Sequence, residues 1–271
     1  MSNEPAPTNL TDKLIEWLSS EGYVLEYQTL HALRAEGMNA TMGFHINSQE
    51  GVPREIDVTS IAVAAKNDNA QSPYVIRIIC ECKYTLDKPW VILQSGISSG
   101  LPQDWQSLPH SGGIHEVGAI LAKNPRFVEG LWHFAPRQHL GHTITQAFRK
   151  DNRDHAFSSL QKVANAAWDW VHLDGLSTSV KLICIPAIVL QGDLFEAWCP
   201  EGNDRFKVRQ IPYGRLSWAG AKNGTMIDVV TQAGLEAWAK IVSKTVAGIF
   251  EACEAKQLRA EEFQHALAAE M

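Results

Sequence analysis

Two strand-like stretches, each interrupted by ionisable side chains and separated by a polar run, predict a β-hairpin in the N-terminal half of the chain. Residues 53–58 (PREIDV) and 75–83 (VIRIICECK) are rich in β-branched residues, and residues 66–73 (KNDNAQSP) have the composition of a turn. Because alternate residues of a strand point to the same face, Glu81 and Lys83 share one face of the second strand. The opposite face carries an apolar row made of Ile76, Ile78, Cys80 and Cys82.

Antiparallel pairing about the middle of the turn places Asp57 beside residues 81–83. Burying unpaired charges on so apolar a strand costs on the order of several kcal/mol. Two neighbouring carboxylates repel each other unless a hard divalent cation such as Mg²⁺ bridges them through oxygen ligands. A lysine beside them can orient or deprotonate an attacking water and help to neutralise developing negative charge. Asp57, Glu81 and Lys83 therefore indicate a site that cleaves phosphodiesters.

The elements expected before the hairpin are two helices and a strand. Apolar spacing and end signals predict helices over residues 11–21 and 24–36 and a strand over residues 38–46. Thr11 is the expected cap of the first helix, whose apolar stripe consists of Leu14, Ile15 and Leu18. Glu26 lies along the apolar face of the second helix, one turn before Leu30, and a partly solvated helix end is one interpretation of this position.

After the hairpin, the pattern predicts a helix and a buried strand. Residues 156–172 have the amphipathic spacing of a helix, and residues 180–190 are almost wholly apolar, as in a strand buried on both faces. A strand, a helix and a second strand in this order predict a crossover connection within a mixed sheet. Later elements are expected as a strand over 194–198 that returns on strand 180–190, edge strands over 205–211 and 215–218, a strand over 225–231, and a helix from Gly234 to about Gln257.

These elements suggest the following domain organisation. Residues 1–10 form a frayed tail, and residues 11–190 form a core domain in which residues 101–150 are an insertion. Residues 191–271 form a C-terminal α+β extension that packs on this core and ends in an exposed helix.

The motif Glu55-Ile56-Asp57 followed by Glu81-Cys82-Lys83 resembles the PD-(D/E)xK nuclease superfamily. The resemblance implies an α/β, restriction-endonuclease-like fold, in which a mixed β-sheet is flanked by helices, over roughly Val24 to Leu190. The order helix, strand, strand, strand before the site agrees with the beginning of that nuclease core. One departure is that no proline directly precedes Asp57.

The resemblance also assigns roles to individual residues. Asp57 and Glu81 would bind Mg²⁺, or Mn²⁺, together with the backbone carbonyl of Cys82, and Lys83 would assist the water. Glu26 matches a glutamate that members of the superfamily often carry on the helix before the first strand, where it joins the metal site. The implied function is a metal-dependent nuclease that acts on nucleic acid, with DNA as the expected substrate, in defence against foreign DNA or in repair. Many relatives cut as dimers, so a homodimer is an open option.

Composition and charge limit this interpretation. The chain has 271 residues, of which 45% are hydrophobic and 20% charged, as is ordinary for a soluble globular protein, and no apolar run is long enough to cross a membrane. Its net charge of −6 argues mildly against nucleic-acid binding, which usually needs a basic footprint. The cysteines at 80, 82, 184, 199 and 253 lie mostly in apolar surroundings, which suits reduced thiols in the cytoplasm. The one-residue gap between Cys80 and Cys82 is too short for a zinc knuckle.

Several other sequence features are weaker candidates for chemistry. Lys88 and Trp90 follow the hairpin and could contact a phosphate and a base, although core or lid packing is the favoured interpretation of Trp90. Gln94 is a weak candidate for a polar helper on the next helix. The sequence around Ser98 matches G-x-S-x-G, but turn residues follow it where a nucleophile elbow needs a helix. The histidines at 110, 115, 133, 139 and 142 lack the spacing of a metal site and are expected to be solvated or locally hydrogen-bonded. Asp228 is expected to make a structural hydrogen bond.

The alternative to a nuclease is a binding or assembly module on the same fold with weak or no catalysis. The acidic net charge and the nine tryptophans motivate it, because some of these tryptophans could form a partner surface. Metal binding distinguishes the two hypotheses, since only the nuclease requires it.

Overall fold

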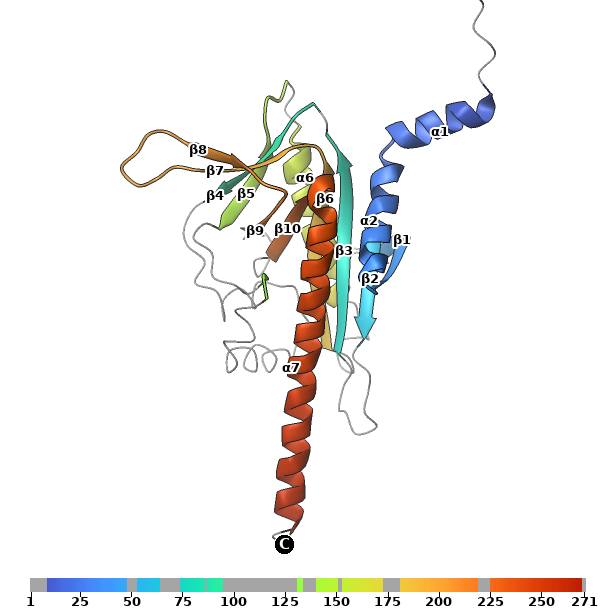
Figure 1. The fold of residues 1–271 in the computed structure, drawn as a ribbon. Helices are drawn as coiled ribbons and strands as arrows, with labels where there is room; N and C mark the ends of the chain where they lie inside the picture. Colours follow the sequence, from blue (N-terminus) through green and yellow to red (C-terminus); the bar gives the residue numbers. More distant parts are fainter. Residues whose placement is uncertain are drawn as a thin grey trace, which may run out of the picture.

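The computed structural model describes residues 9–47, 53–63, 74–85, 87–94, 131–133, 140–150, 153–172, 181–218 and 225–269. Within these residues ten strands form one mixed sheet in the order β1-β2-β3-β6-β10-β9-β5-β4-β7-β8 (Figure 1). The strands are β1 Asn39–Asn47, β2 Pro53–Val63, β3 Tyr74–Tyr84, β4 Trp90–Gln94, β5 Gly141–Gln146, β6 Lys181–Gln191, β7 Leu194–Trp198, β8 Lys207–Gln210, β9 Tyr213–Trp218 and β10 Thr225–Thr231. The helices are α1 Leu10–Ser20, α2 Tyr23–Ala35, α6 His155–Val171 and α7 Leu235–Ala269, with a short 3-10 turn, Gln232–Gly234, before α7.

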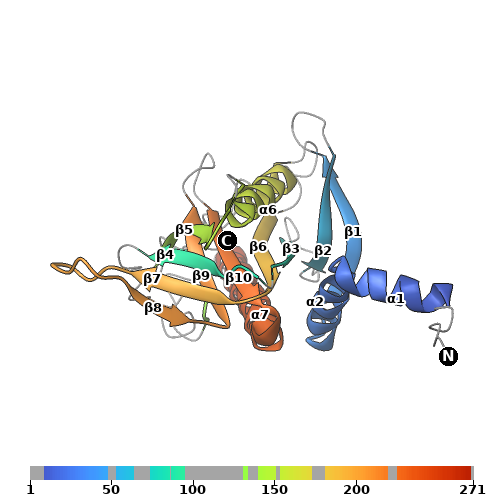
Figure 2. The same cartoon turned by 90° about the horizontal axis from the view of Figure 1, so that it is seen from above.

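Helices cover both faces of the sheet. Figure 2 shows α6 on one face and α2 with α7 on the other. Each face has its own hydrophobic core, and alternate residues of β3 enter different cores, as strand geometry requires. Ile76, Ile78 and Cys80 pack with α2 and α7, whereas Ile79 packs with α6. The protein is therefore an α/β structure with a mixed sheet between helices.

The predicted hairpin is present and its register is the expected one. β2 pairs antiparallel with β3 from Val63↔Val75 to Val58↔Cys80. β1 adds antiparallel to the other edge of β2. The apolar row of β3 is buried, as predicted, although Cys82 at its end is only partly covered.

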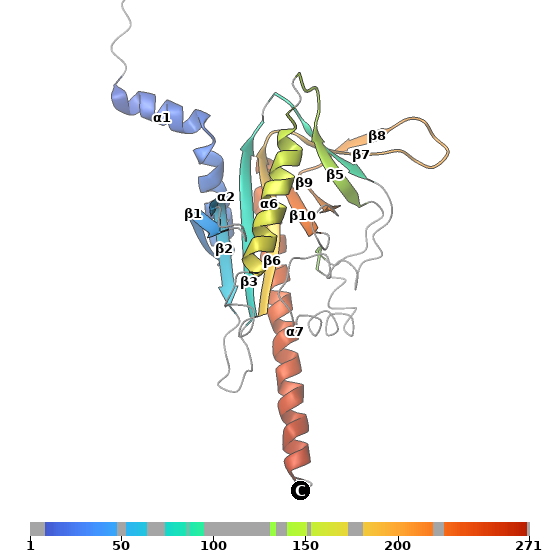
Figure 3. The same ribbon diagram turned by 180° about the vertical axis from the view of Figure 1, so that it is seen from behind.

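The crossover prediction is also confirmed. β3 and β6 are parallel neighbours along their whole length, from Tyr74↔Lys181 to Tyr84↔Gln191. The chain between them passes through α6, which packs across both strands (Figure 3). Asp154 caps this helix by accepting a hydrogen bond from the N–H of Phe157, and the described residues of β6 are buried on both faces up to Leu190.

The C-terminal part of the chain enters the same sheet. β10 pairs parallel with β6, and β9 pairs antiparallel with β10. Strand 194–198 is expected to return on strand 180–190, but it pairs with other strands. It is β7, which is parallel to β4, with Leu194 in register with Trp90, and antiparallel to β8. Only β8 of the two expected edge strands is an edge, since β9 lies between β10 and β5. Gln94 ends strand β4, so its prediction on a helix was wrong.

The first helix differs from its prediction in its cap and its environment. Asn9 caps α1 in place of Thr11, since the side chain of Asn9 accepts a hydrogen bond from the N–H of Thr11. The apolar stripe of α1 is not buried, and Leu14 and Ile15 are 50% and 58% exposed. Figure 1 shows why: α1 projects away from the sheet and covers neither face.

A search of the described helices for a segment long and apolar enough to span a membrane finds none.

Candidate active site at the end of the β2–β3 hairpin

The hairpin ladder stops where Asp57 begins the site. The last paired residues are Val58 and Cys80, and beyond them the Oδ2 atom of Asp57 accepts a 2.6 Å hydrogen bond from the backbone N–H of Cys82. A side chain thus replaces the next rung of the ladder. On the other edge of β2, the register passes over Gly43, whose φ of 65° is a conformation that glycine tolerates without strain.

The alternation of β2 is interrupted at the same place. Ile56 packs in the core under α6, whereas Val58, two residues later, packs in the core under α2 and α7. Regular alternation would put both residues on one face. The strand therefore turns at Asp57, and this turn lets the carboxylate reach the backbone of β3.

Glu81 lies at the centre of the site and is buried. Its side chain is 1% exposed and is held by two lysines: Lys83 Nζ lies 2.5 Å from Oε1, and Lys162 Nζ lies 2.6 Å from Oε2. Apart from these ion pairs, neither oxygen has a hydrogen-bond partner among the described residues. Glu81 and Lys83 share a face of β3, as predicted, and this is the face that α6 covers with Lys162.

The charge of Glu81 controls the protonation of Lys83. Burial alone would lower the pKa of Lys83, but the charge of Glu81, the hydrogen bond to Glu81 and the charge of Asp57 together outweigh burial, and the pKa lies above its usual value. Lys83 is therefore an ammonium ion at neutral pH.

Glu26 reaches the site from α2. It lies in the first turn of the helix, three residues before Thr29, whose Oγ1 lies 3.6 Å from Cys82 Sγ. Residues three apart lie on the same side of a helix, so Glu26 faces the end of β3. Burial raises the pKa of Glu26 to about 7, and the negative charges of Asp57, Glu55 and Glu81 contribute to the increase.

Asp57 has a raised pKa for the same reasons. Burial is the largest cause, followed by the charge of Glu81, while the hydrogen bond from Cys82 opposes the increase. Two lysines therefore do not fully compensate the carboxylates of Glu26, Asp57 and Glu81. Excess negative charge remains where the chain is partly buried.

This donor set fits a hard divalent cation in its chemistry. Carboxylate oxygens and a backbone carbonyl are the ligands that Mg²⁺ and Mn²⁺ prefer, and Mg²⁺ commonly uses only one or two carboxylates and keeps several waters. No three histidine, cysteine, aspartate or glutamate side chains within the described ranges form a ready metal cage. The ion pairs of Glu81 are one reason for this absence, because its two oxygens face the ammonium groups of Lys83 and Lys162.

The remaining sequence candidates lie elsewhere. Trp90 is fully buried, which confirms core packing, and Gln94 donates a hydrogen bond to Glu196 on β7. His133, expected to be solvated or locally bonded, is buried and contacts Asp228 at 2.9 Å, 95 residues away in sequence. Asp228 makes structural hydrogen bonds, as predicted. Ser98 and the histidines at 110, 115 and 139 lie outside the described residues.

Sequence reasoning missed Lys162. It is the only lysine or arginine in α6, and the only acidic residue of that helix, Asp169, also forms an ion pair with the sheet, through Arg54. Two isolated charges on a helix with no other lysine, arginine, aspartate or glutamate were the available signal that both have fixed partners.

No family model matches the chain, and searches of curated proteins and of solved structures also find no match.

Proposed function

We propose that the protein is a metal-dependent nuclease that hydrolyses phosphodiester bonds, with DNA as its expected substrate. The observation that carries this proposal is the hydrogen bond from Cys82 N–H to Asp57, which brings that carboxylate to the buried Glu81 and its lysines. The raised pKa values of Asp57 and Glu26 add support, because they identify negative charge that a bound cation would relieve.

The arrangement of elements supports a restriction-endonuclease-like fold for this part of the chain. Helix α2 and strands β1, β2 and β3 occur in the order of the nuclease core that the motif resembles, and α6 with β6 completes the order. The candidate site lies at the end of the β2–β3 hairpin, between the elements that come before and after it in this order. Strand β5 lies within the proposed insertion of residues 101–150, so the insertion contributes a strand to the far half of the sheet.

Asp57 and Glu81, with the backbone carbonyl of Cys82, are the residues that would hold Mg²⁺ or Mn²⁺. When bound, the cation would lower the pKa of a water molecule and stabilise negative charge on the phosphate. The sequence left open whether Lys83 orients or deprotonates the water. Because Lys83 is held as an ammonium ion, we assign it to orienting the water and stabilising charge. Glu26, with a pKa of about 7, is suited to accept the proton of the water.

Lys162 has a supporting role in this proposal. From α6, Lys162 pairs with Oε2 of Glu81, whereas Lys83 pairs with Oε1. Lys162 therefore holds the carboxylate in place without competing with Lys83 for the same oxygen. A homodimer and a role in defence or repair belong to the proposal as consequences of the resemblance, and a cytoplasmic location follows from the apolar surroundings of the cysteines.

The test of the function is a cleavage assay on supercoiled, linear and single-stranded DNA and on RNA, with Mg²⁺, Mn²⁺ or EDTA. We expect cleavage of at least one DNA form with metal and none with EDTA. Absence of cleavage on every substrate with either metal would contradict the proposal.

A catalytically weak binding or assembly module remains the second candidate because of one observation. Two lysines already neutralise Glu81 without a metal, an arrangement that also suits a site with no chemistry. Calorimetric titration with Mg²⁺ and Mn²⁺ separates the candidates: heat of binding that disappears in Asp57→Asn favours the nuclease, and absence of binding favours the module.

A further inference from the structure

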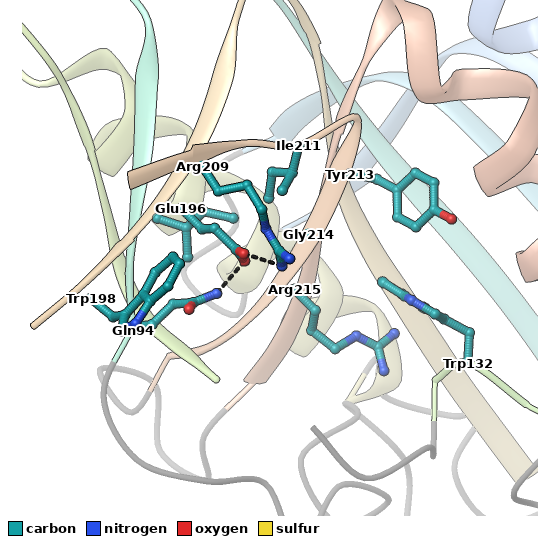
Figure 4. A pocket seen from close by; sticks show the side chains of 10 residues that line it. Gln94, Trp132, Glu196, Trp198, Arg209, Ile211, Tyr213, Gly214 and Arg215 are labelled. Carbon is teal, nitrogen blue, oxygen red and sulfur yellow. Dashed lines mark hydrogen bonds and ion pairs between the residues drawn. The ribbon is translucent and has the colours of Figure 1, made fainter. Parts of the chain in front are cut away.

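A second site lies in the far half of the sheet, away from the hairpin. A cavity of about 380 Å³ opens among strands β4, β7, β8 and β9. Figure 4 shows Gln94, Glu196 and Arg209 on one side of it and Trp132, Tyr213 and Arg215 on the other. Its size is within the range of small-ligand sites, which are typically a few hundred cubic ångströms.

The first unusual feature of the cavity is an unused acceptor on Gln94. The amide nitrogen of Gln94 donates a 2.5 Å hydrogen bond to Oε2 of Glu196, and Arg209 pairs with the other oxygen of this carboxylate. An ionised carboxylate can only accept, so the amide must turn its NH₂ group to Glu196 and its oxygen away. That oxygen, Gln94 Oε1, is buried and has no hydrogen-bond partner among the described residues.

The second feature is an unused donor on Arg215. The side chain of Arg215 is 1% exposed, and two of its three nitrogens have partners. Nε donates to Asp228 at 2.7 Å, and Nη1 donates to the carbonyl of His133 at 2.6 Å. Its Nη2 is buried without a hydrogen-bond partner in the described part of the chain. A buried donor without a partner is destabilising, so its presence in a cavity wall indicates a partner that arrives from outside.

Asp228 keeps this arginine in place. It also accepts hydrogen bonds from His133 and from the indole N–H of Trp238, and all of these groups are buried. The guanidinium of Arg215 in turn lies over the ring of Trp132, 4.9 Å from its centroid. The donor is therefore preorganised before any ligand binds.

The walls of the cavity are aromatic and partly accessible. Trp132 and Tyr213 meet edge to face with ring centroids 5.5 Å apart, and Trp198 adds a third ring. All three rings are half-buried, so part of each faces solvent. Aromatic walls of this kind favour a flat ligand.

We propose that this cavity binds a nucleobase, a planar heterocycle that brings an N–H to Gln94 Oε1 and an acceptor to Arg215 Nη2 while it packs on the aromatic rings. A quaternary ammonium group, the other usual ligand of an aromatic cage, fits less well, because two guanidinium groups and one carboxylate line the cavity. The base could belong to a free nucleotide or to a nucleic-acid strand. The proposal does not rest on cleavage, since base binding is measured without metal.

The test is a calorimetric titration in EDTA with two kinds of probe. The first is the set of four nucleoside 5′-monophosphates, and the second is a pair of single-stranded DNA hexamers, one normal and one in which all six positions are abasic. We expect at least one base-containing probe to bind, and tighter than its abasic counterpart or than ribose 5-phosphate. Binding of the monophosphates indicates a free-nucleotide site, and binding of the normal hexanucleotide alone indicates a base within a strand.

Variants connect this binding to the cavity. Gln94→Met removes the acceptor at nearly constant volume, and Trp198→Ala removes one wall; each should weaken binding at least tenfold. Phe206→Ala, at a residue that is 65% exposed on the β7–β8 connection and does not line the cavity, is the matched control and should leave binding unchanged. Near-ultraviolet circular dichroism confirms folding, and Gln94→Met alone suffices if Trp198→Ala does not fold. Equal binding of normal and abasic probes, no binding of any probe, or full binding by a folded Gln94→Met protein would overturn the proposal.

Discussion

The carboxylate of Asp57 accepts a 2.6 Å hydrogen bond from the backbone N–H of Cys82, two residues beyond the last rung of the β2–β3 ladder. This bond ties two strands together at the point where they separate. It also holds the carboxylate of Asp57 near Glu81, although burial and the negative charge of Glu81 raise the pKa of Asp57. The structure therefore keeps an unfavourable pair of charges by means of a favourable hydrogen bond, which is typical of a functional site.

Asp57→Asn separates these two effects. The asparagine oxygen can still accept the Cys82 N–H, whereas the negative charge is gone. We expect metal-dependent cleavage to fall on the order of 10²–10³-fold, while the melting temperature of the metal-free protein stays the same or rises. Thermal unfolding in EDTA and initial cleavage rates measure both quantities. Asp57→Ala, which also loses the acceptor, should be less stable than Asp57→Asn by about 1–3 kcal/mol; equal stability of the two variants would show that the hydrogen bond contributes nothing.

The raised pKa of Glu26 predicts a pH dependence of stability. The folded protein keeps a proton on Glu26 up to a pH of about 7, whereas the unfolded chain releases it near 4.5. Because the folded state binds more protons in this window, stability of the metal-free protein should fall as the pH rises from about 4.5 to about 7. Asp57, whose pKa is also raised, acts in the same direction.

Glu26→Gln tests this dependence because it removes the titrating group. The variant should show a flatter profile than wild type in urea unfolding between these pH values, and Mg²⁺ should flatten the wild-type profile too, since a cation favours the ionised carboxylates. Glu16→Gln on α1 is a control at a carboxylate outside the site and should leave the slope unchanged. A slope that is the same in Glu26→Gln and wild type would show that Glu26 does not titrate as described.

Lys162 and a metal ion should compete for Glu81. Lys162→Met removes one of the two ammonium groups that hold the buried carboxylate, so the unfolding free energy of the metal-free protein should fall by about 1–3 kcal/mol. The freed oxygen should then bind Mg²⁺ more tightly, by about tenfold, which corresponds to about 1.4 kcal/mol. Calorimetry and denaturant unfolding measure the two effects, with Gln161→Met, the exposed neighbour on α6, as control. Weaker Mg²⁺ binding in Lys162→Met than in Gln161→Met would contradict the competition.

Asp228 should matter for stability and not for cleavage. Asp228→Asn removes the charge that compensates the buried guanidinium of Arg215, and breaking such a buried pair costs on the order of 3–5 kcal/mol. Cleavage per folded molecule should stay close to wild type, because the network contains none of the hairpin residues. A variant with wild-type stability, or one that is folded but inactive, would show that the role of Asp228 is different.

The hairpin could be predicted from the sequence because its signals are local. Alternation within β3 determined its two faces, and the position of the polar run in the sequence between the strands determined the expected register, so Asp57 was expected beside Glu81 and Lys83. The long apolar run of β6 likewise predicted a strand buried on both faces. In these elements the local pattern and the tertiary environment agree.

The missed features depend on contacts between distant parts of the chain. Lys162 and Glu81 are 81 residues apart in sequence, and Arg215 and His133 are 82 apart. No periodic pattern within a single helix or strand can therefore predict either contact. The partner of β7 was mispredicted for the same reason, because adjacency in sequence favoured β6 whereas the sheet pairs it with β4. The cavity around Gln94 depends on these pairings and was therefore not visible in the sequence.

The most direct test of the proposed nuclease compares Lys83→Ala with Lys13→Ala, an exposed lysine on α1, in Mg²⁺-dependent nicking of supercoiled DNA. Wild type and Lys13→Ala should nick at similar rates, and Lys83→Ala should be slower on the order of 10²–10³-fold while it stays folded. Glu81→Ala should lose activity altogether, and EDTA should stop the reaction in every case. Nicking that survives both Lys83→Ala and Glu81→Ala would contradict the assignment of the site to Asp57, Glu81 and Lys83.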